Sequence, residues 1–250
     1  MRRRAAVVGT FAVLFIGLPA VADGPPNGFV PLFNGKDLTG WKVPTGDNGH
    51  WKVVDGVIDY DARSESKVAD KSLWTERSFK DFVLRVDWRL KNDQPGFMNP
   101  RVKQIQPDGS HKKRPDGKDD DLTLEDVDSG VYLRGTSKAQ VNIWMWPIGS
   151  GEVYGYRTDP KMPRAVRAAV TPKKHADKPR GEWNHFDITM KGDKLTVVLN
   201  DEEVISNAEL PGVPAAGPIA LQHHGSMKDG KWTSPPSLVQ FRNVAIKELK

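Results

Sequence analysis

The residues best suited to chemistry stand near the end of the chain, in the segment 217–225, Gly-Pro-Ile-Ala-Leu-Gln-His-His-Gly. Side chains on a strand alternate between two faces, so Ile219 and Leu221 predict one buried face. Gln222 and His224 then project from the other face, while His223 lies on the core side or at the strand end. An imidazole titrates near neutral pH, so His224 could act as a base or bind a metal. A purely structural histidine is the alternative.

The same alternation places other polar and aromatic side chains away from the core. It applies to the segments 82–90, 131–134, 140–146 and 151–156. The predicted outward residues are Asp87, Tyr132, Arg134, Gln140, Asn142, Trp144, Glu152 and Tyr154, with Gln222 and His224. Planar rings and directional amides suit the binding of sugar rings. This interpretation assumes that the strands share one sheet; the alternative is a scatter over several faces.

The acidic residues indicate a function less clearly than the histidine, amide and aromatic residues do. Glycoside hydrolysis usually uses two carboxylates ~5 to 10 Å apart, and alternation places only Asp87 and Glu152 among the aromatic residues. Glu125, Asp126 and Asp128 form a second cluster, whose oxygens could bind a divalent cation. A solvated loop is the other interpretation of that cluster. Neither a phosphate-binding glycine loop nor a G-x-S-x-G motif is present.

The elements that must position these residues are short runs of β-forming residues separated by turn signals. Asp55-Gly56 and Lys191-Gly192-Asp193 are typical hairpin turns. The expected strands are 51–54, 57–60, 82–90, 130–134, 140–146, 183–190, 194–199, 219–222 and 239–249. No long segment shows helical periodicity, so we predict an all-β antiparallel sandwich or barrel. The polar stretches 100–121 and 160–180 are predicted surface loops, although one of them could border a binding cleft.

The N-terminus has the pattern of an export signal. Three arginines precede an apolar run, and Ala20-Val21-Ala22 is a small-x-small cleavage site. We expect a signal peptide at 1–22, a linker at 23–28 and one domain at 29–250, in the periplasm or secreted; an uncleaved anchor is the alternative.

The chain has 37 Lys+Arg and 32 Asp+Glu, so loss of Arg2, Arg3 and Arg4 with the signal leaves a net charge of 34 − 32 = +2. That balance gives no case for a nucleic-acid partner, and the chain has no Cys for disulfides or thiol catalysis.

A series of short motifs follows in order across nearly the whole chain. They include Phe33-Asn34-Gly35-Lys36-Asp37-Leu38, Leu73-Trp74-Thr75, Asp128-Ser129-Gly130-Val131-Tyr132, Leu221-Gln222-His223-His224-Gly225 and Phe241-Arg242-Asn243-Val244. Together they resemble the 3-keto-disaccharide hydrolase family, also known as domain of unknown function 1080. The resemblance implies a single-domain, concanavalin A-like, jelly-roll β-sandwich. Two departures stand out: Asp128 replaces a usual Asn, and the segment 139–144 lacks the usual Glu-x-Gln strand.

The resemblance also implies an activity, the cleavage of 3-keto-disaccharides or 3-keto-glycosides. A ketone at C3 acidifies the C2 proton, so a base can remove this proton and the C1 substituent can leave by elimination. Water then adds back, and the net reaction is hydrolysis. The implied catalytic residues are His224 as base or ligand of a Lewis-acid cation, Glu152 as acid, and Arg134 with Gln222 as oxyanion binders. Trp144 and Tyr154 would stack on the sugar; Tyr132, Gln140, Asn142 and Asp87 would also contact the substrate.

Two other functions fit the same residues. A non-catalytic carbohydrate-binding sandwich would need the aromatic and amide groups alone, and a protein-binding module would use the Trp-rich face. The enzymatic interpretation requires His224, Glu152 and Arg134 to converge within about 10 Å, because proton transfer needs hydrogen-bond reach. The sequence gives no indication of oligomeric state.

Overall fold

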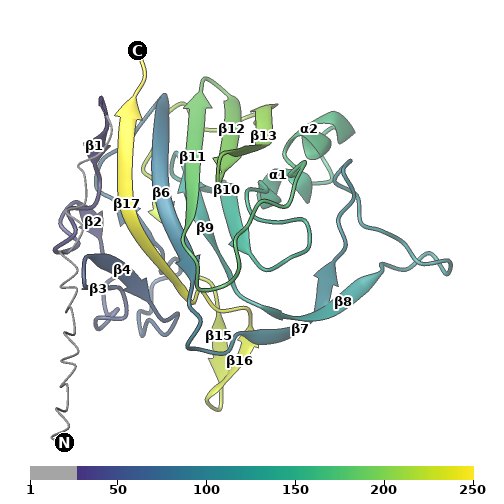
Figure 1. Ribbon diagram of the computed structural model, residues 1–250, viewed down its shortest axis with the longest axis horizontal. Coiled ribbons are helices and arrows are strands. Elements are labelled where there is room, and N and C mark those ends of the chain that lie inside the picture. Colours follow the sequence, from purple (N-terminus) through teal and green to yellow (C-terminus); the bar gives the residue numbers. More distant parts are fainter. Residues whose placement is uncertain (1–26) are drawn as a thin grey trace, which may run out of the picture.

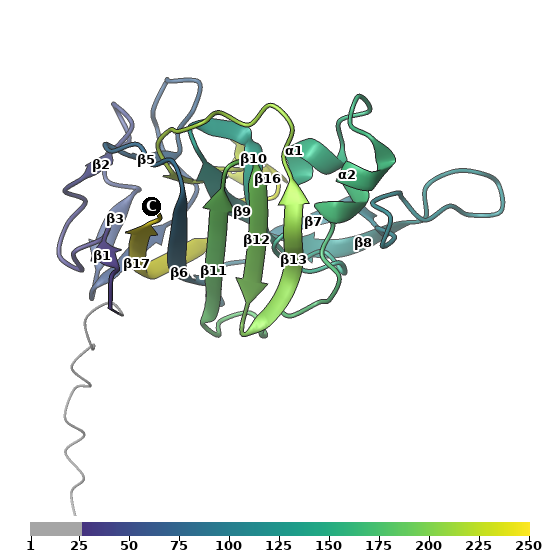
Figure 2. The same cartoon turned by 90° about the horizontal axis from the view of Figure 1, so that it is seen from above.

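The computed structural model describes residues 27–250, so the predicted signal peptide 1–22 and most of the linker 23–28 lie outside the described residues. These residues form two stacked antiparallel sheets with few helices (Figures 1 and 2). The predicted all-β antiparallel sandwich in a single domain is confirmed. Within the described part of the chain, no helix is both long and apolar enough to span a membrane.

The larger sheet has eight strands. Its order is β13 (Glu202–Glu209), β12 (Lys194–Leu199), β11 (Asn184–Lys191), β6 (Phe82–Leu90), β17 (Val239–Glu248), β4 (Val57–Tyr60) and β3 (Lys52–Val54), with β1 (Val30–Pro31) also paired to β17. Strand β6 runs through the middle and alternates strictly between buried and half-buried residues. Strands β6 and β12 have the predicted bounds, because regular alternation and clear turns define both.

The smaller sheet has five strands. Its order is β10 (Thr136–Trp144), β9 (Asp128–Leu133), β14 (Ala220–Leu221), β5 (Leu73–Thr75) and β2 (Trp41–Lys42). The inward side chains of both sheets form one core. In the smaller sheet these include Val131, Leu133, Val141, Ile143 and Leu221. The outer face of this sheet therefore carries residues 128, 130 and 132 of β9, and 140, 142 and 144 of β10.

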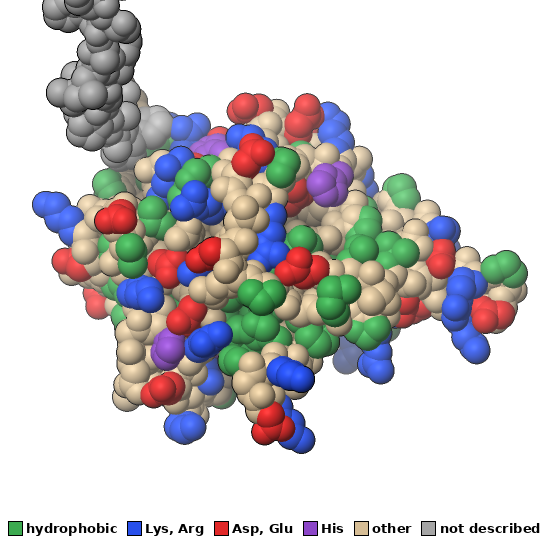
Figure 3. All heavy atoms as spheres, turned by 60° about the horizontal axis from the view of Figure 1, so that its bottom comes forward, with side chains coloured by type: hydrophobic (Ala, Val, Ile, Leu, Met, Phe, Trp, Pro, Cys, Tyr) green, Lys and Arg blue, Asp and Glu red, His purple; other side chains and the backbone are tan. Residues whose placement is uncertain are grey.

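Two hairpins and two short helices extend the sandwich. β7 (Phe97–Lys103) and β8 (Asp121–Asp126) form an arm, and β15 (Ser226–Lys228) and β16 (Lys231–Ser234) a hairpin at the end of the molecule that Figure 3 brings forward. α1 (Tyr154–Arg157) and α2 (Arg164–Ala169) lie beside the edge of the sheets (Figure 2).

These additions correct three expectations. The stretch 100–121 is not a simple loop, because its two ends belong to β7 and β8, which pair as the arm. The stretch 160–180 contains α2. The segment 151–156 is not a strand throughout, since α1 begins at Tyr154 and buries Tyr156 in the core.

Candidate active site

The outer face of the five-stranded sheet brings most of the predicted polar residues together in rows. Tyr132 pairs with Gln140, Gly130 with Asn142, and Asp128 with Trp144. On the other side of β9, the Gln222 backbone amide donates to Gly130 O at 2.9 Å. Continued alternation then brings His224 beside Asp128, with His224 Nε2 at 3.8 Å from Asp128 Oδ2. Both side chains reach solvent, at 35% and 21% exposure, so a ligand could contact them.

The backbone fixes the ring of His224. Its backbone amide donates to Ser237 Oγ at 2.6 Å, and Nδ1 lies 2.5 Å from Pro235 O. A carbonyl oxygen only accepts, so Nδ1 must carry the hydrogen of this bond. In the neutral ring, Nε2 then holds the free lone pair and faces Asp128. This geometry suits a general base. His223, by contrast, turns inward as predicted, with Nδ1 at 2.6 Å from the hydroxyl of buried Tyr60.

Asp128 and Asp126 are carboxyls in a setting that disfavours charge. Burial raises the pKa of Asp128, His224 opposes the rise and the nearby Asp126 adds to it, so that the resulting pKa is about 7. Burial also raises the pKa of Asp126, although Asn99 Nδ2 and Trp146 Nε1 donate to its Oδ2 at 2.8 and 2.9 Å. Oδ1 of each carboxyl is buried without a hydrogen-bond partner. At neutral pH, Asp128 can therefore hold a proton and donate it.

Glu152 continues the middle row at the far edge of β10, where Asn142 N donates to Glu152 O at 2.9 Å. Its side chain is fully buried, and Arg157 Nε of α1 donates to Oε1 at 2.7 Å. Burial raises the pKa of Glu152 to about 7 against the opposing effect of Arg157. Oε2 of Glu152 and Oδ1 of Asn142 have no partner. The charge of Asp128 adds to the rise in the pKa of Glu152. Because the Glu152 side chain is fully buried, it cannot contact a ligand.

Two amide side chains form the floor of the site. Gln140 Nε2 donates to Gln222 Oε1 at 2.5 Å and to Ser129 O at 3.2 Å, which fixes both amides. Gly130 makes this possible, because a Cβ there would lie 2.7 Å from Gln140 Nε2. The two glutamines were predicted from alternation, and the structure places them side by side.

Aromatic rings flank the amides at both ends. Tyr132 lies 5.7 Å from Trp74 between ring centroids, a tilted pair on the outer face. At the other end Trp144 stacks on Trp146, with ring centroids 4.2 Å apart, and its edge meets exposed Tyr154 at 6.2 Å. Trp144 is buried and its indole nitrogen donates to Gly149 O at 2.7 Å. Sequence reasoning missed Trp74 as a site residue, although its alternation with buried Leu73 and Thr75 was a signal.

Two predicted residues lie elsewhere. The expectation that Asp87 shares this face is wrong, because β6 belongs to the eight-stranded sheet. There Asp87 accepts from His185 Nδ1 at 2.6 Å and from Asn243 Nδ2 at 2.7 Å. Arg134 does not join the cluster either, because it has φ +50° at the turn after β9 and its side chain is buried. Its guanidinium donates to Asp81 Oδ1 and to the carbonyls of Lys80, Gly192 and Pro214.

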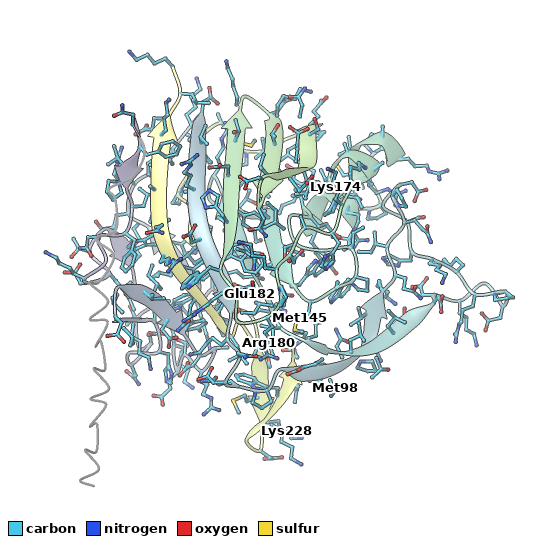
Figure 4. The ribbon with its side chains drawn as sticks, in the orientation of Figure 1. Met98, Met145, Lys174, Arg180, Glu182 and Lys228 are labelled. Carbon is cyan, nitrogen blue, oxygen red and sulfur yellow. The ribbon has the colours of Figure 1, made fainter. Side chains whose placement is uncertain are left out.

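The carboxylates considered for a cation do not converge. Glu125 points away from Asp126, since neighbours on β8 face opposite sides, and pairs with Arg180 Nη1 at 2.8 Å. Figure 4 labels Arg180 near the base of the arm. Across residues 27–250, no three His, Asp or Glu side chains are arranged to hold a metal ion.

Comparison with known proteins agrees with this architecture. Two crystal structures of candidate glycosyl hydrolases from Parabacteroides distasonis share the fold. One superposes with a TM-score of 0.58 at 23% identity, covering 89% of this chain and 84% of that one. The other has a TM-score of 0.53 at 20% identity, covering 89% and 95%. No curated protein matches the chain. A family model, the 3-keto-alpha-glucoside-1,2-lyase-like domain, matches residues 28–247, nearly the whole described chain. The chain therefore belongs to the 3-keto-alpha-glucoside-1,2-lyase-like family.

Proposed function

We propose that this protein cleaves 3-keto-glycosides, including 3-keto-disaccharides, by elimination and rehydration at the outer face of the five-stranded sheet. The observation that carries the proposal is the pairing of His224 and Asp128. Pro235 O holds Nδ1 of His224, which leaves Nε2 facing the site, and Asp128 is a carboxyl with a pKa of about 7 at 3.8 Å from this Nε2. An elimination needs a base and an acid placed close together.

The steps follow from these two groups. His224 Nε2 removes the proton from C2 of the sugar, which the C3 ketone acidifies. The electron pair forms the C1–C2 double bond as the C1–O bond breaks, and protonated Asp128 gives its proton to the leaving oxygen. Water then adds to C1 and its proton goes to the Asp128 carboxylate, while protonated His224 returns a proton to C2. Both groups end as they began, and the net reaction is hydrolysis.

Other residues of the face have supporting roles. Gln140 and Gln222 supply directional hydrogen bonds for sugar hydroxyls, and Tyr132 with Trp74 offers an aromatic surface for the ring. Asp128 replaces Glu152 as the proposed acid, because Glu152 is fully buried and a general acid must reach the leaving oxygen. Arg134 has no role in this scheme. Glu152, Asn142 and Arg157 instead hold together the edge of the site where α1 meets β10.

The test is turnover of 3-keto-glucosides beside their unoxidised parents. His224→Ala should lower kcat by about 10²- to 10⁴-fold, the usual contribution of a general base, and Asp128→Asn should also lower it. His175→Ala is the matched control, because His175 is an exposed histidine outside the cluster. Retained turnover in His224→Ala would remove the proposed base. If the wild-type protein bound these sugars but released no product, a non-catalytic carbohydrate-binding role would replace the enzyme.

A further inference from the structure

A groove of about 480 Å³ lies between the arm and the β15–β16 hairpin. Its apolar lining comes from Phe97 and Met98 of β7, Met227 of β15, Trp232 of β16 and Pro95. Its polar side chains are Arg63, Gln94 and Lys231. Gly96 and Gly230 complete the lining. Met98 is 60% exposed and Met227 39%. Figure 3 shows hydrophobic side chains gathered on this end of the molecule, above the protruding hairpin.

The walls of the groove adjoin the candidate active site. Phe97 pairs with Asp126 across the arm, and a Cβ at Gly96 would lie 2.6 Å from Asp126 O. On the other wall, a Cβ at Gly225 would lie 3.5 Å from the Trp232 ring, and Gly225 directly follows His224. Both walls of the groove are therefore continuous in the backbone with the residues next to His224 and Asp128.

The chemistry of the lining points to one kind of occupant. Methionine sulfurs and aromatic edges make favourable contacts with aromatic rings. A sugar ring would need several directional partners, whereas Gln94 is the only uncharged polar side chain here. Two cationic side chains and no acidic one line the groove. The Arg63 guanidinium lies 6.0 Å from the Trp232 ring centroid, at the limit of a cation–π contact, so it can still pair with an anion.

We propose that this groove binds the leaving group of the substrate, and that this group is an aromatic aglycone carrying a carboxylate. The inference rests on the proposed function and narrows its substrate class to 3-keto-glucosides of phenolic acids. The sugar lies on the Gln140–Gln222 floor, its glycosidic oxygen lies at Asp128, and the aromatic ring lies among Met98, Met227 and Trp232. The carboxylate meets Arg63 or Lys231.

The first experiment measures binding of the free aglycone, so it does not depend on turnover. The probe is 4-hydroxybenzoate, titrated by NMR against the protein, with phenol and glucose as comparisons. We expect 4-hydroxybenzoate to bind more tightly than phenol, and glucose not to compete with it. Arg63→Gln should weaken binding by about fivefold, as loss of a partly exposed ion pair does. Met98→Gln should weaken it by about threefold.

Lys228→Gln is the matched control for charge. Lys228 is exposed at the tip of the same hairpin and does not line the groove (Figure 4), so this variant should bind 4-hydroxybenzoate as the wild type does. Met98 and Arg63 are both exposed, so neither substitution should unfold the protein. The proposal is overturned if 4-hydroxybenzoate does not bind, if phenol binds equally well, or if Lys228→Gln has the same effect as Arg63→Gln.

Kinetics then separate the two proposals. The 3-keto-glucoside of 4-hydroxybenzoate should have a higher kcat/KM than 3-keto-disaccharides. Arg63→Gln should lower kcat/KM more for this phenolic-acid glucoside than for the disaccharides. Equal kcat/KM values with normal turnover would overturn the groove assignment alone. Tight 4-hydroxybenzoate binding with no turnover of any 3-keto-glucoside would overturn the proposed catalysis and leave a groove that binds aromatic acids.

Discussion

At the scale of single residues, Gly130 determines where the Gln140 side chain can lie. A Cβ at residue 130 would come within 2.7 Å of Gln140 Nε2 and 2.8 Å of Val141 O. Gly130→Ala should therefore displace the Gln140 amide from Gln222, and it should also shift the backbone of β10 at Val141 and lower the stability of the protein. We expect KM for 3-keto-glucosides to rise about fivefold to tenfold, the loss of roughly one hydrogen bond. Steady-state kinetics check this, and Gln140→Ala should give a similar KM. An unchanged KM in Gly130→Ala would show that Gln140 does not bind the sugar.

The raised pKa of Asp128 should lower the stability of the folded protein at alkaline pH. Its folded pKa of about 7, raised by burial, exceeds the usual value near 4. The stability linked to this group is therefore complete below pH 4 and is lost as pH rises through 7. Asp128→Asn carries no charge and avoids the loss. A rise of about 3 pKa units would correspond to about 4 kcal/mol at about 1.4 kcal/mol per unit. Because the Asp128 side chain is 21% exposed, solvent screening reduces this penalty to roughly 2 kcal/mol, which gives a Tm for Asp128→Asn higher than wild type by roughly 4–8 °C at pH 8.5.

Thermal unfolding at pH 3 and 8.5 measures this difference. At pH 3 the two proteins should melt within about 1 °C of each other, because Asp128 is then protonated in both the folded and the unfolded protein. A lower Tm for Asp128→Asn at pH 8.5 would mean that the carboxylate is stabilised in the folded protein. The same variant should lose turnover, so stability and activity would change in opposite directions.

Alternation along strands predicted which face each side chain occupies, but not which sheet a strand joins. Gln140, Gln222 and Tyr132 were predicted together and lie together, because β9, β10 and β14 are neighbours. Asp87 obeys the same alternation on β6, yet lies on the opposite side of the sandwich. Strand order depends on long-range pairing, which a local pattern does not contain. Arg134 departs for a local reason, since its positive φ breaks the alternation at the end of β9.

At the scale of elements, α1 packs against the β10 edge of the site and is joined to it by the buried ion pair between Arg157 and Glu152. The segment 151–156 alternates like a strand, and α1 has only four residues, too few for helical periodicity to show in the sequence. Its close approach to β10 depends on Gly155, where a Cβ would lie 2.5 Å from Lys138 O. Arg157 then reaches Glu152, and both side chains are at most 2% exposed.

Removing one partner of this pair should destabilise the protein strongly. Arg157→Met leaves Glu152 buried without its charge partner, which typically costs about 3–5 kcal/mol. Urea unfolding at pH 8 measures the loss, and the double variant Arg157→Met/Glu152→Gln should recover much of it because no charge remains buried. If the single variant lost less than about 1 kcal/mol, α1 would not depend on this contact. His111 also contacts Arg157, at 3.1 Å, and ties α1 to the arm.

At the scale of the whole molecule, the two outer faces of the sandwich have different chemistry. On the side of the five-stranded sheet, Asp128 of β9 and Asp126 of the adjoining arm have raised pKa values near His224. The eight-stranded sheet instead carries a network of ion pairs. In that network His185 lies between Asp87 and Asp187, with Nδ1 at 2.6 Å from one and Nε2 at 3.5 Å from the other. Hydrogen bonds to Asp187 and Asp87 raise the pKa of His185 to about 9.

This network predicts an alkaline loss of stability that is independent of the active site. The folded pKa of His185 lies above its unfolded value near 6.5, so its contribution is complete below pH 6.5 and disappears as pH rises through 9. His185 is 35% exposed, which limits the effect to about 1 kcal/mol, or roughly 2–4 °C in Tm. His185→Gln should therefore melt below wild type at pH 6 and level with it at pH 10. Because the two faces are separated by the core, Asp128→Asn should leave this difference unchanged. A Tm gap between His185→Gln and wild type that persisted at pH 10 would mean that His185 acts through packing rather than through its charge.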